Sequence, residues 1–265
     1  MKIPSEIVVH PYTMGLDELR EQSVSCPSTS LFAKEAQLGK VTELALKNYD
    51  HRATFAYASV GCSIGAELDS VAALLSAQGV RQAAMCGIDI DQTTLKVAEN
   101  GQYIDPYYLP IIHGVRSRRL RNLGFETSTA GMSPGSIAID ARPVREQHKV
   151  NFYELDLGQE TFDGSRQDLI TCHNVLPHVT EHDPSKARAM IGRLCSLVAR
   201  GGILSIAATE EWHESPFASK DSTTEEIPSY GYFHGRLVSA MCRRYNMEIV
   251  LRDKQQRVVA LRKTG

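Results

Sequence analysis

The stretch TFAYASVGCSIGAELDSVAALLSAQ, residues 54–78, contains the strongest fold signal in the chain. It starts as a buried strand pattern, turns between Gly61 and Gly65, and continues as a helical pattern. Glycine lets the backbone turn tightly and lets a ligand approach without a Cβ in the way. The next strand pattern, residues 82–88, ends at Asp89. A carboxylate there can accept both hydroxyls of a ribose, so the turn and the acid together indicate an adenosine-containing ligand.

Outward from this stretch, short apolar runs alternate with helical patterns, which is typical of βαβ units around a parallel sheet. The remaining strand patterns are 150–155, 168–174, 203–209, 246–253 and 257–263, and the remaining helical patterns are 93–100, 184–200 and 233–245. The last two strands predict a closing antiparallel pair at the sheet edge. We therefore predict an α/β fold with a Rossmann-like seven-stranded sheet, helices on both faces and a helical N-terminal extension.

The predicted organisation is a helical N-terminal extension or lid over 1–50 and one α/β domain over 51–265. Residues 102–149 are an insert with many Tyr, Pro, Gly and Arg residues, for which we predict loops and a small excursion from the sheet. Residues 209–231 are polar and contain Pro, and we predict a lid loop there. Both segments follow predicted strand ends, where a doubly wound sheet binds its ligands.

Composition narrows the class of protein. The chain has 265 residues, 42% hydrophobic and 23% charged, with a formal net charge of −2. These values are typical of a globular domain and give no global attraction to nucleic acid or membrane. No apolar run approaches the ~20 residues that a membrane span needs. The six cysteines are scattered without metal-ligand spacing. We expect a reduced, cytoplasmic protein with no disulfide and no metal site.

Three other interpretations of the glycine turn compete at this point. It can be a purely structural connection between strand and helix. It can bind NAD, although position 66 is Ala where the third glycine of that motif belongs, and Glu67 would repel a pyrophosphate. It can be a hydrolase elbow with Ser63 as the nucleophile, although such an elbow normally follows several strands.

Several segments resemble the chemotaxis receptor methyltransferases, the CheR family, over roughly residues 28–210. The matching segments are Ser30-Leu-Phe-Ala-Lys-Glu35, Gly61-Cys-Ser-Ile-Gly-Ala-Glu67, Gly87-Ile-Asp-Ile-Asp91, Leu95-Lys-Val-Ala-Glu-Asn-Gly-Gln-Tyr103, Val150-Asn-Phe-Tyr-Glu-Leu-Asp-Leu157, Asp168-Leu-Ile-Thr-Cys-His-Asn-Val-Leu176 and Gly201-Gly-Ile-Leu204. Their order, and an insert of family-like length between them, strengthen the likeness. The resemblance implies S-adenosylmethionine as cofactor and S-adenosylhomocysteine as product.

The resemblance also implies a cofactor site. Glu67 would lie near the amino-acid part of the cofactor, Asp89 on the ribose and Asp156 near the adenine, where the family often has Asn. Asn174 would close the pocket after the fourth strand. The implied cofactor-binding residues are Gly61, Ser63, Gly65, Glu67, Asp89, Ile90, Asp156, Leu157 and Asn174.

The chain departs from the family where the acceptor is handled. The family's lead-in Arg corresponds to Lys34, which keeps the charge but loses bidentate recognition of a carboxylate. The family's Arg-Asn is His173-Asn174 here, and an aromatic expected further on is His178. An imidazole could deprotonate a hydroxyl, phenol or amine acceptor; alternatively, each histidine simply bonds the backbone or the cofactor. We take Lys34, His173 and His178 as the candidate catalytic residues.

These departures favour methylation of an oxygen or nitrogen nucleophile on a small molecule of secondary-metabolite type. The alternatives are glutamate O-methylation of a protein, as in chemotaxis, and a non-catalytic module that binds S-adenosylmethionine. Neither nucleic acid nor membrane is an expected partner.

Overall fold

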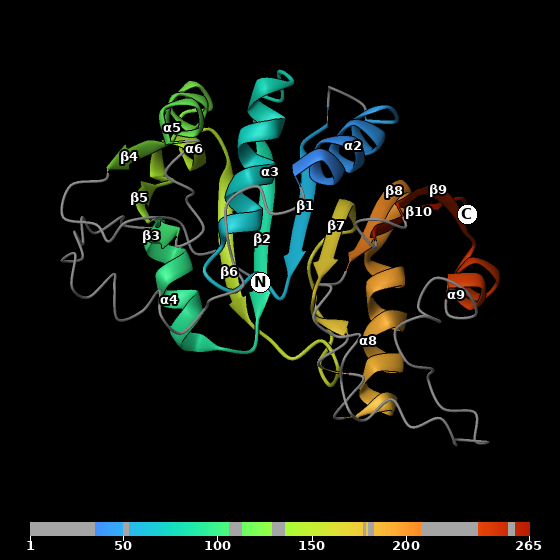
Figure 1. Cartoon of the computed structure of the whole chain (residues 1–265). Coiled ribbons are helices and arrows are strands. Elements are labelled where there is room, and N and C mark those ends of the chain that lie inside the picture. The colour runs from blue at the N-terminus through green and yellow to red at the C-terminus, as the bar shows by residue number, and fades with distance from the viewer. Residues whose placement is uncertain are drawn as a thin grey trace.

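The computed structural model describes residues 35–49, 53–105, 113–128, 136–176, 179, 183–207, 238–253 and 258–265. Within these residues a seven-stranded sheet of order β6-β2-β1-β7-β8-β10-β9 forms the centre of the molecule (Figure 1). The strands are β1 (Phe55–Val60), β2 (Ala83–Asp89), β6 (Lys149–Glu154), β7 (Gln167–His173), β8 (Val198–Ala207), β9 (Met247–Asp253) and β10 (Val258–Lys263). Strands β6, β2, β1, β7 and β8 are parallel, and β10 runs antiparallel to both of its neighbours. The predicted sheet and its closing antiparallel pair are confirmed.

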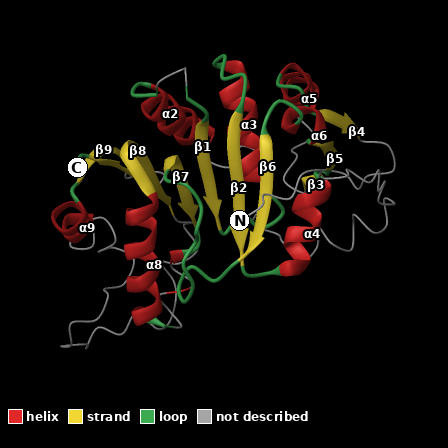
Figure 2. Cartoon of the chain, turned by 180° about the vertical axis from the view of Figure 1, so that it is seen from behind, coloured by secondary structure: helices red, strands yellow, loops and turns green. Residues whose placement is uncertain are grey.

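Helices cover both faces of this sheet, as the opposite views in Figures 1 and 2 show. They are α2 (Glu35–Leu46), α3 (Ala66–Ala77), α4 (Gln92–Asn100), α5 (His113–Asn122), α6 (Arg142–Arg145), α8 (Pro184–Leu197) and α9 (Val238–Tyr245). Side chains alternate between two apolar cores along each central strand. On β1, Phe55 and Tyr57 pack into the core shared with α2 and α3, whereas Ala58 and Val60 pack into the core shared with α8 and α9. Because both faces are buried, β1 is apolar at most of its positions rather than alternating, and Ser59 is the polar exception.

Local sequence signals explain where two of these helices start and stop. Helix α4 begins after Asp91, whose carboxylate accepts the N–H of Thr93 at 2.8 Å. It ends at Gly101, which adopts the left-handed conformation with φ 70°. Helix α8 begins in the same way, because Asp183 caps it ahead of Pro184 in the first turn.

One predicted boundary is wrong. The helix predicted over 184–200 ends at Leu197, and β8 already begins at Val198, so Gly201 and Gly202 lie inside a strand instead of ending a helix. Gly201 has φ +80°, and a Cβ at Gly202 would lie 2.8 Å from the carbonyl oxygen of Gln167. The glycine pair therefore allows the irregular start of the β7–β8 pairing. Its role is in the strand pairing and not in ending the helix.

The insert is more ordered than the loops predicted for it. Strands β3 (Gln102–Asp105), β4 (Glu126–Ser128) and β5 (Ile137–Asp140) form a separate antiparallel sheet of order β3-β5-β4. This sheet lies with α5 and α6 at one side of the molecule, next to α4 (Figure 1). Ile137 and Ile139 of β5 are buried while the residues between and after them are less so, which is the pattern of a one-sided sheet.

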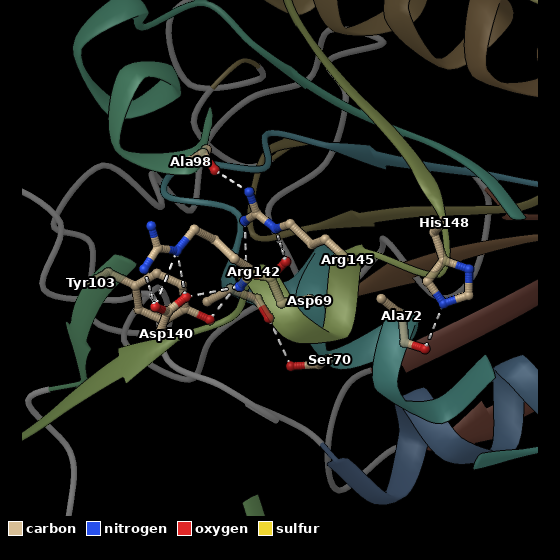
Figure 3. Close-up of polar contacts among 10 residues, drawn as sticks. Asp69, Ser70, Ala72, Ala98, Tyr103, Asp140, Arg142, Arg145 and His148 are labelled. Atoms are coloured by element: carbon tan, nitrogen blue, oxygen red, sulfur yellow. Dashed lines mark hydrogen bonds and ion pairs between the residues drawn. The ribbon is translucent and has the colours of Figure 1, made fainter. Parts of the chain in front are cut away.

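A buried ion pair ties the insert to α3 (Figure 3). Arg145 of α6 donates from Nε to Asp69 Oδ1 at 2.6 Å and from Nη2 to Asp69 Oδ2 at 2.8 Å. Tyr103 of β3 donates to the same carboxylate at 3.2 Å, and Arg145 also bonds the carbonyl of Ala98 and lies over the ring of Phe152. The insert is therefore fixed to the helix that follows the glycine turn.

Two predicted segments extend beyond the described residues. Of the N-terminal extension over 1–50, the structure describes residues 35–49, which contain α2. Gln37 of this helix donates to Asp253 at the end of β9. The predicted lid loop at 209–231 lies outside the described residues. In the part of the chain that is described, no helix is both long and apolar enough to cross a membrane.

Candidate functional site

The candidate site lies where the strand order reverses. From β1 the chain adds β2 and β6 on one side of the sheet and later β7 and β8 on the other, so the reversal lies between β1 and β7. Ligands of such sheets bind outside the carboxyl ends of the strands at this point. The residues that follow β1, β2 and β7 are the glycine turn, Ile90 and Asn174.

The glycine turn is held closely against its neighbours. The N–H groups of Gly61 and Cys62 both donate to the carbonyl of Ile88, at 2.7 and 3.1 Å. Gly61 and Gly65 have φ 69° and 83°, a region that glycine adopts without strain. A Cβ on Gly61 would lie 2.1 Å from a methyl group of Val175, so this position has no room for a side chain.

Asp89 is oriented by two backbone donors. Its Oδ2 accepts the N–H of Ser63 at 2.8 Å, and its Oδ1 accepts the N–H of Asp91 at 3.0 Å. Each carboxylate oxygen has a further lone pair, so Asp89 can still accept two hydroxyl groups. Ser63 adopts φ 49°, an uncommon conformation for a residue with a side chain, and Ile90 is 67% exposed beside the carboxylate.

Glu67, in the first turn of α3, is surrounded by donors. Ser59 donates to its Oε1 at 3.2 Å, and Nδ1 of His173 lies 2.5 Å from its Oε2. Burial would raise the pKa of Glu67, but His173 and the hydroxyl groups of Thr171 and Ser59 hold this pKa below its ordinary value. The side chain keeps 21% of its surface exposed. Glu67 is therefore an ionised carboxylate on a side chain that is only partly buried.

His173 and Asn174 end β7 in different ways. The His173 ring is buried between Glu67 and Ser205, whose hydroxyl lies 2.9 Å from Nε2. Asn174 turns away from the sheet with φ 63°, and its N–H donates to the carbonyl of Ala207 at 2.8 Å. Its Oδ1 is buried and has no hydrogen-bond partner among the described residues. Such an acceptor suits a donor group brought by a ligand.

Asp156 is engaged with the protein. It accepts the N–H of Gly158 at 2.9 Å and the side chain of Gln159 at 3.0 Å, and it pairs with Lys186 at 2.5 Å. Burial raises the pKa of Asp156, but the Lys186 ammonium and the N–H of Gly158 lower it below its ordinary value. Leu157 beside it is buried. The predicted adenine contact of Asp156 stays a prediction.

The structure brings most of the predicted residues together and adds some that the sequence did not single out. Lys34 and His178 lie outside the described residues. The missed residues are polar side chains on central strands: Ser59, Thr171 and Ser205, all buried. Their signal was a hydroxyl inside an otherwise apolar strand, which points to a buried polar contact.

This arrangement fits S-adenosylmethionine. Asp89 offers acceptors for ribose hydroxyls, and Glu67 and the Asn174 oxygen that has no partner among the described residues offer acceptors for an ammonium group. A carboxylate beside the turn suits a cofactor that has a cationic sulfonium and no phosphate.

Residues 28–226 match the sequence family described as CheR methyltransferase, SAM binding domain. The chain belongs to this family. It is an S-adenosylmethionine-dependent methyltransferase, which removes the NAD-binding and hydrolase interpretations of the turn. Comparison with curated proteins finds no significant match to this member of the CheR family.

Solved structures show distant likenesses of the fold to this CheR-family chain. An O-methyltransferase family protein from Burkholderia thailandensis is 17% identical with a TM-score of 0.46; the match covers 87% of this chain but 56% of that protein, about half its length. N-methyltransferase NodS from Bradyrhizobium japonicum WM9 is 14% identical with a TM-score of 0.44, over 88% of this chain and 97% of that one. The plantazolicin methyltransferase BpumL, in complex with a monoazolic desmethylPZN analog and SAH, is 12% identical with a TM-score of 0.48, over 87% of this chain and 83% of that one.

Proposed function

We propose that this CheR-family enzyme methylates an oxygen or nitrogen nucleophile of a small molecule. The observation that carries the proposal is the environment of His173. The resemblance places an arginine at this position in the family, where a charged fork could recognise a carboxylate acceptor. Here the side chain is a buried imidazole whose two nitrogens contact Glu67 and Ser205. Recognition of a glutamyl carboxylate from this position is therefore lost.

The residues of the chain would align and desolvate the reactants. Bound S-adenosylmethionine would supply the methyl group: the acceptor nucleophile would form a bond to the methyl carbon in line with the breaking carbon–sulfur bond, and S-adenosylhomocysteine would be the leaving group. We propose that Asp89 holds the ribose, with Ile90 beside it, that Glu67 and Asn174 hold the amino-acid end, and that Asp156 and Leu157 border the adenine. Lys34 and His178 are the proposed acceptor-handling residues, with His178 as a candidate base. Alignment and exclusion of water account for most of the rate that such a site can add.

The second candidate is a protein carboxylate acceptor, which family membership favours. One experiment separates the candidates. The purified chain is incubated with S-adenosylmethionine labelled in its methyl group and with a cell extract divided into small-molecule and protein fractions. Asp89→Ala serves as the matched inactive control, because it removes the proposed ribose acceptor.

We expect label in the small-molecule fraction with the wild type and none with Asp89→Ala. Label confined to protein and released as methanol by mild base would overturn the small-molecule proposal in favour of glutamyl esterification. Cofactor binding without transfer to either fraction would instead identify a non-catalytic module.

A further inference from the structure

A group of buried polar side chains surrounds Glu67, and its members come from three strands. Ser59 of β1 and Thr171 of β7 direct hydroxyl groups to the carboxylate. Ser205 of β8 contacts the far side of the His173 ring. All three hydroxyl-bearing residues are buried completely or nearly so. Burying a hydroxyl group costs free energy unless it has a hydrogen-bond partner. These hydroxyl groups find their partners at the Glu67 carboxylate and at the His173 ring that contacts it, so the carboxylate is the centre of the arrangement.

His173 has no ring nitrogen to spare. A carboxylate only accepts, so the 2.5 Å contact with Glu67 requires Nδ1 to carry a proton and donate it. Nε2 lies 2.9 Å from the hydroxyl oxygen of Ser205. A general base must present a free nitrogen to the proton that it abstracts. In this geometry both nitrogens of the imidazole are occupied by protein groups.

We propose that His173 is a positioning residue: backed by Ser205, it fixes the Glu67 carboxylate in the orientation that binds the ammonium group of S-adenosylmethionine. The inference rests on the proposed contact between Glu67 and the amino-acid end of the cofactor. It assigns His173 a role in cofactor binding instead of proton transfer from the acceptor.

Prior fixation of Glu67 matters because a glutamate side chain has several rotatable bonds. A ligand that must immobilise such a side chain loses part of its binding free energy to conformational entropy. Ser59 holds one carboxylate oxygen and His173 the other, so the side chain is already fixed without the ligand. With two lone pairs on each oxygen, the carboxylate still has capacity for an ammonium donor.

Ser205 makes the arrangement tolerant of the protonation state of the ring. Its hydroxyl can donate to Nε2 of a neutral imidazole or accept from Nε2–H of a charged one. Among the described residues, Tyr57 of β1 and Cys172 of β7 are the other titratable groups that interact with this carboxylate. Burial raises the pKa of both, so they stay neutral near neutral pH.

Two ligands separate a positioning role from general structural support. S-adenosylhomocysteine has the amino-acid chain, whereas 5′-methylthioadenosine has the same adenosine and sulfur but lacks that chain. Each is titrated by calorimetry into the wild type, His173→Ala, His173→Asn and His173→Gln. Asn places an N–H near the position of Nδ1 and can still donate to Glu67. Gln reaches toward Ser205 instead.

We expect His173→Ala and His173→Gln to weaken S-adenosylhomocysteine binding by about tenfold or more, roughly 1.4 kcal/mol, the value of one hydrogen bond to a charged group. Binding of 5′-methylthioadenosine should change by less than about twofold, and His173→Asn should recover most of the loss. Thr42→Val is the matched control, because Thr42 is also buried but its hydroxyl bonds only its own helix, at Leu38, in the contacts described; both ligands should bind it as they bind the wild type.

Equal weakening of both ligands in His173→Ala and His173→Asn would overturn the proposal, since the loss would then concern the whole pocket. Unchanged binding of S-adenosylhomocysteine to His173→Ala would also overturn the proposal, because the contact between His173 and Glu67 would then make no difference to cofactor binding. Failure of the small-molecule acceptor proposal would leave these binding ratios unaffected, because no acceptor is present in the titrations.

Discussion

Arg145 of the insert and Asp69 of α3 form an ion pair with two hydrogen bonds, and both side chains are buried. Burial disfavours the charge of Arg145, but Asp69 raises the pKa of the guanidinium above its ordinary value. A Cβ on Gly65 would lie 3.1 Å from Nη2 of Arg145, so the pair lies directly against the glycine turn. The insert is thus anchored at the point where α3 begins.

Removing one partner of this pair should destabilise the protein strongly. Asp69→Ala leaves a buried guanidinium without its carboxylate, and we expect a loss of about 3–5 kcal/mol in the free energy of unfolding. Chemical denaturation followed by circular dichroism measures it. Glu248→Ala is the contrast, because Glu248 pairs with Arg262 at 3.3 Å on an exposed surface; it should cost less than about 1 kcal/mol. Similar losses in the two variants would show that the buried pair has no special role.

The described cysteines should differ in reactivity. Burial raises the pKa of Cys86 and of Cys195 to about 12, and both side chains are shielded from reagents. We expect neither to be alkylated at pH 8 while the protein is folded, because the thiolate is the reactive form. Cys242 is only partly buried and should react before them. Peptide mapping after timed alkylation measures the order, and labelling of Cys86 as fast as Cys242 would contradict it.

Part of the candidate site could be predicted because its signals are local. Gly61 and Asp89 stand at the ends of strand patterns, Gly65 stands at the start of a helical pattern, and parallel strands bring their carboxyl ends to one edge of the sheet. The support beneath Glu67 could not be predicted in this way. Glu67 and His173 are 106 positions apart, and their contact depends on the register of β1 against β7. A hydroxyl in an apolar strand indicates a buried contact but does not name its partner.

The same distinction applies to the fold. Helix α4 was predictable because its two ends are marked by local signals, the N-cap Asp91 and the C-cap Gly101. The end of α8 was not, because glycine after a helical pattern is a common helix stop, whereas Gly201 and Gly202 here allow an irregular strand pairing with β7. The insert sheet was missed for a related reason: its strands are short, and pairing with each other, rather than propensity, stabilises them.

The pair of Asp156 and Lys186 should make a small, pH-dependent contribution to stability. The pKa of Asp156 is lowered in the folded state, so its contribution is complete above the unfolded-state pKa of about 3.9 and is lost as the pH falls through the lower folded-state value. Since both side chains are about one quarter exposed, the coupling should be about 0.2–1 kcal/mol. A double-mutant cycle with Asp156→Asn and Lys186→Met measures it.

The cycle should be run at pH 7 and again at pH 2.5 in the same buffer system. A coupling energy that is present at pH 7 and small at the lower pH is expected. A coupling that increases on acidification would contradict the assigned direction of the pKa.

Gly61→Ala should disturb the cofactor turn through a single close contact. The added Cβ would lie 2.1 Å from a methyl group of Val175. The alanine backbone would also have to adopt φ 69°, which residues with a side chain rarely do. We expect a loss of about 1–2 kcal/mol from the backbone conformation and about 1–3 kcal/mol more from overpacking, together with weaker binding of S-adenosylhomocysteine. Gly79→Ala separates the two costs, because Gly79 has φ 82° but no atom of the described structure within 4 Å of the Cβ position.

The double variant Gly61→Ala/Val175→Ala completes the argument. Shortening Val175 removes the methyl group that the new Cβ meets at 2.1 Å and leaves only the Val175 Cβ at 3.3 Å, so the double variant should recover most of the overpacking cost and part of the lost affinity. The backbone cost should remain and should equal that of Gly79→Ala. If Val175→Ala restores nothing, the turn is limited by its backbone conformation alone, and the close approach of the ends of β1 and β7 does not decide why position 61 is glycine.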